Sequence, residues 1–344
     1  MIEFNNIFYI IFTAFFLSSL IIYVFNKNDI LIDQVSYSKH KKLKNDYLKS
    51  PSLCGGIIIF ICSFLFFKDL SLLIFFSFLI LVTGLLSDLN RLSSPKKRIL
   101  IQFTTCLGFV ILSDLGLKDL RIETFNYLLS FNFISILFTV FCILILVNGS
   151  NFLDGLNTLV IGYYSLVCFF LILLSSNFDL SINPNINLLI IFLLVLFPFN
   201  FFGKIYLGDS GSYLIGFYIS FFFIDFSLRN SLVSPYLICF FLWYPAFENL
   251  FSILRRFFSK NKVDAADQYH LHQMIYNYLI NKKIINTKYT NTFVASLINI
   301  YNFIIFICFY KFYSNTKILI LVILTNILIY LIIYFLMKTK NLSL

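Results

Sequence analysis

Charged residues are scarce in this chain: Asp, Glu, Lys and Arg make up only 12% of its 344 residues, whereas hydrophobic residues make up 60%. A soluble domain carries roughly 25% charged residues, so the composition excludes an ordinary soluble protein. The seven cysteines stand singly and form no C-x-x-C pair, which argues against a disulfide framework. No Pro-rich or Ser-rich linker separates one part of the chain from another.

What the sequence does contain is a series of eleven apolar runs separated by short polar gaps. Lipid cannot satisfy open backbone groups, and no alternation of the kind found in β-barrels is visible, so the runs predict helices. We therefore predict an all-α integral membrane protein, a polytopic bundle of about eleven transmembrane helices forming one domain over residues 1–344. The predicted spans are 7–25, 53–67, 70–87, 99–115, 127–148, 155–176, 185–202, 210–227, 231–254, 291–310 and 317–337.

The net charge of +10 is distributed unevenly along the chain. If the N-terminus lies outside, alternation of the spans puts 20 of the 26 Lys and Arg residues on the inner side. This bias predicts a cytoplasmic C-terminus and explains the basicity without nucleic acid, which we exclude as a partner. The predicted cytoplasmic segments are 26–52, 88–98, 149–154, 203–209 and 255–290.

Four polar islands lie in the inner gaps: Gly84 to Arg98, Asn148 to Gly155, Asn200 to Ser212, and Arg255 to Gln273. Each has a structural interpretation. Aspartates in the second and third could be helix N-caps, the acidic residue of the first could be solvated, and the arginines and histidines of the fourth could lie at the membrane surface. Because all four islands converge on one membrane face, we favour a functional site.

The residue types in these islands suit phosphoryl transfer from an anionic donor. Carboxylates can hold Mg²⁺, which needs one or two of them beside substrate phosphates. The turn from Gly208 to Ser212 opens a helix, whose N–H groups and dipole attract phosphate, and basic side chains neutralise the transition state. The amides of Asn148 and Asn151 can read a base or a sugar. The sequence thus predicts a nucleotide-activated donor, a metal ion and a membrane-borne acceptor.

The motifs themselves resemble the polyprenyl-phosphate N-acetylhexosamine-1-phosphate transferases, glycosyltransferase family 4, which include the muramyl-pentapeptide translocase. The matching pieces are G-L-L-S-D with R-I-L-I-Q, N-x-x-N-x-x-D-G, F-N-x-x-x-K-I-Y-L-G-D-S-G-S, and H-L-H-Q after R-R. Asp33, His40 and the segment from Ser50 to Gly56 are similar to the family's first inner loop. The resemblance covers about residues 30 to 275.

This resemblance implies transfer of a sugar-1-phosphate from a UDP-N-acetylhexosamine to undecaprenyl phosphate, with release of UMP, at the bacterial inner membrane. It implies Mg²⁺ as the cofactor, with Mn²⁺ as the alternative ion, and a homodimer as a conceivable assembly. The implied roles are metal binding for Asp209 and Asp88, catalysis for these two and Asp154, and substrate binding for Asn148, Asn151, Asn200, Lys204, Arg256, His270 and His272.

Three positions depart from the family pattern: the pair of aspartates is replaced, Gln273 replaces a third histidine, and Glu248 stands where Asp is common. The pair corresponds to Ser87-Asp88, or to Asp88-Leu89 if one residue is inserted before Arg98, and in either alignment one carboxylate is missing. The acceptor phosphate has a second pKa near ~6 and needs little help from a general base, so we still expect activity. Three alternatives stay open. The donor could be a muramyl pentapeptide, or the chain could be an inactive relative that binds lipid phosphate. The chain could also be a transporter, which only Glu248 beside Pro245 favours.

Overall fold

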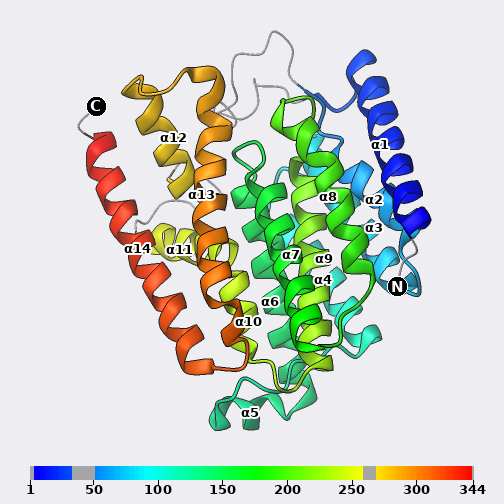
Figure 1. Cartoon of the computed structure of the whole chain (residues 1–344), viewed down its shortest axis with the longest axis vertical. Coiled ribbons are helices and arrows are strands. Elements are labelled where there is room, and N and C mark those ends of the chain that lie inside the picture. Colours follow the sequence, from blue (N-terminus) through cyan, green and yellow to red (C-terminus); the bar gives the residue numbers. More distant parts are fainter. Residues whose placement is uncertain (1–3, 33–50, 259–268, 343–344) are drawn as a thin grey trace.

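The computed structural model describes residues 4–32, 51–258 and 269–342, and these form fourteen α-helices with no strand among them. The prediction of an all-α polytopic membrane protein is confirmed (Figure 1). Asp33, His40 and Ser50 lie outside the described residues. Of the described helices, seven are long and apolar enough to cross a membrane, and a bent pair makes up to eight.

Each predicted span coincides with a helix or with the bent pair, although several are shorter than a bilayer requires. The helix α2 has only 12 residues, so at 1.5 Å per residue it reaches about 18 Å, well short of the ~30 Å hydrocarbon core. The spans correspond to α1 (Phe4–Lys27), α2 (Gly55–Phe66), α3 (Ser71–Asp88), α4 (Pro95–Ser113), α6 (Asn132–Leu153), α7 (Leu159–Phe178), α8 (Asn185–Phe201), α9 (Gly208–Arg229), α10 (Pro235–Phe241) with α11 (Trp243–Phe258), α13 (Thr287–Phe309) and α14 (Thr316–Leu342).

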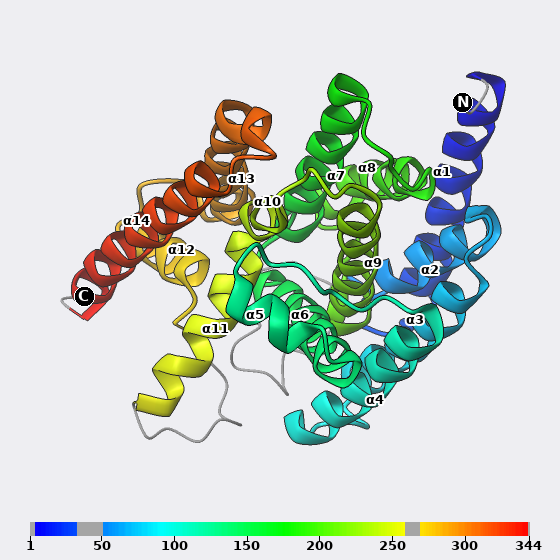
Figure 2. The same ribbon diagram turned by 90° about the horizontal axis from the view of Figure 1, so that it is seen from below.

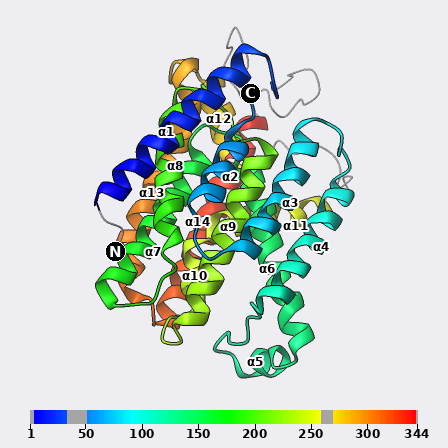
Figure 3. The ribbon, with the colours of Figure 1, turned by 90° about the vertical axis from the view of Figure 1, so that its right-hand side faces the viewer.

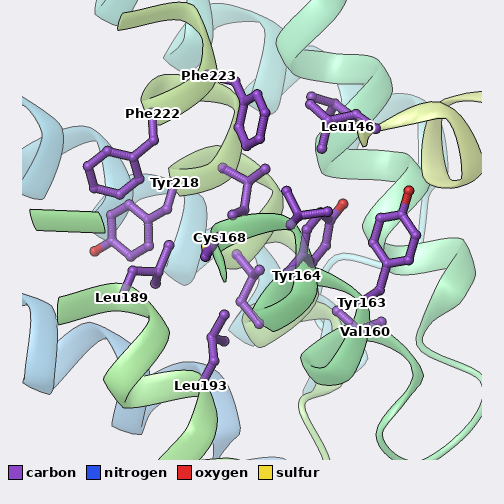
Figure 4. Packing of buried hydrophobic residues seen from close by; sticks show 14 of the residues in the cluster. Leu146, Val160, Tyr163, Tyr164, Cys168, Leu189, Leu193, Tyr218, Phe222 and Phe223 are labelled. Atoms are coloured by element: carbon purple, nitrogen blue, oxygen red, sulfur yellow. The ribbon is translucent and has the colours of Figure 1, made fainter. Parts of the chain in front are cut away.

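Helix α9 forms the centre of the bundle, with α6, α7, α8, α2 and α3 around it and α1 and α14 at the two sides (Figure 2). The core between these helices is aromatic, with Tyr164, Tyr218 and Phe222 fully buried (Figure 4). Two glycines allow α9 to be approached closely: a Cβ on Gly84 would lie 2.3 Å from the Cα of Ser210, and one on Gly56 would lie 2.6 Å from the nitrogen of Gly211. Small residues at helix contacts are typical of membrane bundles. The start of α9 is therefore held against α2 and α3 at backbone distance.

The predicted continuous span 231–254 is wrong, because the chain bends by 78° between α10 and α11. The cause is Pro245, which has no N–H to donate to the carbonyl oxygen of Phe241, four residues earlier. The hydroxyl of Tyr163 donates to that carbonyl instead, at 2.8 Å. After the bend, α11 packs against α6, where the side-chain amide of Asn249 donates to the carbonyl of Ile145 at 2.9 Å.

Two further boundaries differ from the prediction. The predicted span 127–148 begins within a separate short helix, α5 (Glu123–Leu129), which precedes α6 and lies at the opposite end from the start of α9 (Figure 3). The predicted segment 255–290 contains α12 (Leu271–Asn281), whose mixed polar and apolar sequence gives no transmembrane signal. Helix α12 brings the two histidines into the bundle.

Candidate functional site

Asp209, in the first turn of α9, is the centre of a network of charge-assisted hydrogen bonds. Its Oδ2 accepts from the Ser87 hydroxyl at 2.5 Å and from Nη1 of Arg98 at 2.9 Å, and its Oδ1 accepts from the Asn151 amide at 2.8 Å. The same Arg98 nitrogen donates to the Ser87 hydroxyl at 2.7 Å. Side chains from α3, α4 and α6 thus meet at one carboxylate, which stays 19% exposed.

The other predicted carboxylate, Asp88, binds the backbone rather than a side chain of α9. Its two oxygens accept the N–H groups of Asp209 at 2.8 Å and Ser210 at 3.1 Å. The first N–H groups of a helix have no partner within the helix, and a negative charge there also opposes the dipole favourably. Gly208 makes this possible with φ +71°, since a Cβ there would lie 2.7 Å from Oδ2 of Asp88. Asp88 therefore caps α9 from a neighbouring helix.

The end of α6 links this cluster to a second one. Asn151 donates to Asp209 and to the Ser212 hydroxyl, and Asn148, one turn earlier, donates to the side chain of Gln102 at 3.0 Å. Asp154 is the C-cap residue of α6, half-buried at the point where the helix ends. The predicted residues of the second island thus lie on the last two turns of one helix.

The second cluster contains the histidines. His270 and His272 are buried, and their rings stack with centroids 5.7 Å apart. The ring of His270 also packs on Phe152 of α6, at 5.0 Å, and the guanidinium of Arg256 lies 5.9 Å from the same phenyl ring. Nδ1 of His270 lies 2.8 Å from Glu248, which is fully buried on α11. Arg256, His270 and His272, all predicted site residues, therefore gather beside the end of α6.

Two predicted residues have other surroundings. Asn200 is buried, and its amide accepts from the N–H of Thr158 and donates to the carbonyl of Ile205, so it joins the loop before α7 to the loop before α9. Lys204 is exposed and lines an open groove of about 470 Å³ together with Lys27 and Tyr23 of α1. Both residues precede Asp209 closely in the sequence, but none of the described hydrogen bonds joins either of them to its carboxylate.

The surroundings of the acidic residues and histidines differ from the structural alternatives given for them, although Asp88 has a structural role of its own as the cap of α9. Asp154 and Asp209 make no N-cap of α7 or α9, since the N-cap positions are Thr158 and Leu207. Asp88 is bonded to backbone, and the two histidines are buried rather than at the surface. His270 has extended backbone, at ψ 142°, which is the condition under which two histidines separated by one residue can share a face.

Sequence reasoning missed three contacts of the predicted site residues, which are made by Arg98, Phe152 and the hydroxyl of Ser87. Arg98 stood in a quoted motif, but nothing local indicated that it would reach a carboxylate 111 residues later in the chain. Phe152 lies between Asn151 and Asp154 in the motif. Its aromatic side chain was the one available sign that it could pack against another ring. Ser87 was treated as a lost carboxylate, whereas its hydroxyl donates to Asp209.

The residues at this site fit one hard cation. Asp209 is partly exposed, and each carboxylate oxygen has about two lone-pair sites, so the hydrogen bond from Asn151 to Oδ1 does not by itself prevent coordination. Mg²⁺ commonly uses one or two protein carboxylates together with substrate phosphates and waters. Within the described residues no group of three or more His, Cys, Asp or Glu side chains forms a complete metal cage. The donor set therefore suits an ion that arrives with a phosphate.

Comparison with known proteins confirms the resemblance. Residues 70–227 match the family described as glycosyl transferase family 4. Over 205 residues the chain is 26% identical to a probable undecaprenyl-phosphate N-acetylglucosaminyl 1-phosphate transferase of Bacillus subtilis, covering 58% of this chain and 56% of that protein. Over 195 residues it is 29% identical to a phospho-N-acetylmuramoyl-pentapeptide-transferase of Dictyoglomus thermophilum, covering 54% of this chain and 62% of that protein.

The matched region is the part of the molecule that carries the acidic cluster. Residues 70–227 include Ser87, Asp88, Arg98, Asn151 and Asp209, but not the histidines. The alignments span somewhat more than half the length of each relative.

Proposed function

We propose that this chain, similar to transferases of glycosyl transferase family 4 over residues 70–227, transfers a sugar-1-phosphate from a UDP-N-acetylhexosamine to undecaprenyl phosphate. The observation that carries the proposal is the convergence of Ser87, Arg98 and Asn151 on Asp209 at the start of the central helix. A nucleotide diphosphate needs a basic group and a carboxylate for its cation, and both occur here in Arg98 and Asp209.

In the reaction, an oxygen of the lipid phosphate attacks the phosphorus that carries the sugar. The bond between this phosphorus and the oxygen bridging the two phosphates breaks, and UMP leaves with that oxygen. At neutral pH much of the acceptor is already a dianion, because its second pKa lies near ~6, so proton removal contributes little to the barrier. Mg²⁺, when bound, neutralises the diphosphate.

The protein's own groups then have distinct tasks. Asp209 would hold the cation, and Asn151 and the hydroxyl of Ser87 keep its carboxylate oriented. Arg98 lies next to Asp209, where it can neutralise negative charge on the reacting phosphates. Beside the end of α6, Arg256 with the buried His270 and His272 forms the cluster that would recognise the sugar and the diphosphate of the donor. We infer a place in the bacterial inner membrane with these residues on the cytoplasmic face and the N-terminus outside.

The test is release of UMP by detergent-purified protein from a panel of UDP-N-acetylhexosamines with undecaprenyl phosphate and Mg²⁺. The expected result is release that requires lipid and cation and falls at least about 100-fold in Asp209→Asn, since this variant loses the metal-binding charge. Asp225→Asn is the matched control, because Asp225 lies on the same helix and pairs with Arg229 at its far end. Equal activity of wild type and Asp209→Asn would refute the assignment of the cation.

Two other functions stay testable in the same assay. The relative from Dictyoglomus thermophilum favours UDP-MurNAc-pentapeptide as a donor, so it is included in the panel. An inactive protein that binds lipid phosphate is favoured by Ser87, which leaves one carboxylate where the family has two. Folded protein that releases no UMP with any donor but binds undecaprenyl phosphate would identify this second function.

A further inference from the structure

We propose that Tyr330, on the last helix, is a positioning residue that acts through Glu248 to fix the orientation of His270. The kinetic effect expected of this residue rests on the proposed function, whereas its effect on the orientation of His270 does not. The geometry involves three residues that are far apart in the sequence and come from α14, α11 and the segment before α12. Glu248 is fully buried, and His270 and Tyr330 are 3% and 2% exposed.

The carboxylate of Glu248 is surrounded by donors. Its Oε1 lies 2.8 Å from Nδ1 of His270 and also accepts the N–H of Leu271 at 3.4 Å, while its Oε2 accepts the hydroxyl of Tyr330 at 2.7 Å. An ionised carboxylate is only an acceptor, so Nδ1 of His270 is the protonated nitrogen, and Nε2 is the ring's other polar atom. The bond to Glu248 therefore decides which edge of the imidazole is turned toward the cluster around Phe152.

A second contact from α14 holds the same segment. Arg255 donates to the hydroxyl of Tyr334 at 2.9 Å and to the carbonyl of Tyr269, the residue before His270. The rings of Tyr330 and Tyr334 stack one helical turn apart, so both hydroxyls lie on one face of α14. The last helix thus fixes both the backbone and the side chain at the start of the histidine cluster.

This arrangement gives α14 a task beyond crossing the membrane. Long polar side chains on a lipid-exposed helix are costly unless they meet partners inside the bundle. Here the partners are a buried carboxylate and an arginine that lead directly to a predicted donor-binding residue. We expect displacement of the Tyr330 hydroxyl to loosen His270 without altering the Asp209 network, which no residue of α14 contacts through a described hydrogen bond.

The experiment uses Tyr330→Phe, which removes only the hydroxyl and keeps the ring. The matched control is Tyr301→Phe, since the hydroxyl of Tyr301 donates to Asn326 at 2.9 Å and likewise joins α13 to α14. Because the chain has only three histidines, the ¹⁵N NMR spectrum of its imidazoles can be assigned with single His→Gln variants. The expected result is a changed or broadened His270 signal in Tyr330→Phe, an unchanged His40 signal, and a wild-type spectrum for Tyr301→Phe.

Kinetics provide the second readout. For Tyr330→Phe we expect about a tenfold rise in KM for the UDP-sugar and a change in kcat of less than about threefold, whereas Tyr301→Phe should change neither. Glu248→Asp should raise the KM for the UDP-sugar less than Glu248→Ala does. A wild-type His270 signal in Tyr330→Phe overturns the proposal, as does an equal change in both tyrosine variants. A chain that releases no UMP would refute the proposed function but leave the NMR test of His270 decisive.

Discussion

At the residue scale, the acidic cluster departs from the pattern it resembles at Ser87, which has a hydroxyl where the resemblance implies a carboxylate. The hydroxyl lies 2.5 Å from Asp209 and shares one nitrogen of Arg98 with it. One negative charge therefore faces one positive charge across this contact. The exchange lowers the negative charge available to a cation while the hydrogen-bond geometry around Asp209 is maintained.

We predict that Ser87→Asp strengthens binding of divalent cations by about tenfold, because the number of carboxylate ligands is a main determinant of affinity at such sites. The measurement is titration of purified protein with Mn²⁺, followed by calorimetry or by electron paramagnetic resonance. Ser87→Asn is the control, since it has the same size without the charge. If both variants bind Mn²⁺ as the wild type does, position 87 has no influence on the cation.

Asp88 gives a prediction about stability rather than catalysis. Its carboxylate caps α9, and losing a capping acceptor at a helix N-terminus costs about 1–2 kcal/mol. Asp88→Ala should therefore unfold at a lower temperature than wild type in detergent, with Asp88→Asn between them because the amide keeps one acceptor. An unchanged Tm in Asp88→Ala would mean that the cap contributes nothing measurable.

The sequence predicted which polar residues matter but not how they pair. Asp209, Asn151 and Asp88 were each visible in short motifs, and their convergence followed from the alternation of the spans. The pairing of Arg98 with Asp209 and of Tyr330 with Glu248 was not visible, because it depends on packing between helices far apart in the chain. Helix periodicity carries no information on such contacts.

At the scale of elements, the positions of the apolar runs predicted the helices well but did not predict where a helix is broken. Every predicted span coincides with a helix or with the bent pair, since a run of apolar residues has no other stable form in lipid. The 78° bend before α11 was missed, although Pro245 was visible, because a proline in a membrane helix produces anything from a small kink to a break. The resulting position of Glu248 depends on this bend.

The close contact of α3 with α9 predicts that Gly84→Ala disrupts the site. The added methyl carbon would lie 2.3 Å from the Cα of Ser210, and backbone cannot yield without separating the helices, so we expect a loss of stability of about 1–3 kcal/mol or more. Activity should fall as Asp88 moves away from α9. Gly108→Ala is the control, because its methyl group would meet only the ring of Phe76, at 3.1 Å. Thermal unfolding and UMP release measure the two effects, and equal behaviour of both variants would show that the α3 contact is tolerant.

At the scale of the whole molecule, the polar site lies at the end of the bundle where α3 ends and α9 begins, which the charge pattern of the sequence predicts to be the inner end. With the N-terminus outside, 20 of 26 Lys and Arg residues fall on the inner side, and the remaining six fall on the outer side. An excess of this size is characteristic of cytoplasmic loops. The proposed function requires a UDP-sugar, and the site must therefore face the cytoplasm, where such donors are made. The charge pattern and the proposed chemistry thus favour the same orientation.

The orientation can be measured with exposed lysines at the two ends. Lys96 lies in the first turn of α4, beside Arg98, and Lys118 follows the far end of the same helix; both are exposed. We predict that Lys118→Cys reacts with a membrane-impermeant maleimide in intact cells above the background of the seven native cysteines, whereas Lys96→Cys reacts only after permeabilisation. The physical reason is that about 20 residues of α4 separate the two positions, which is close to the number needed to cross the hydrocarbon core. The opposite pattern would place Asp209 outside the cell, away from any UDP-sugar, and would therefore refute the transferase along with the topology.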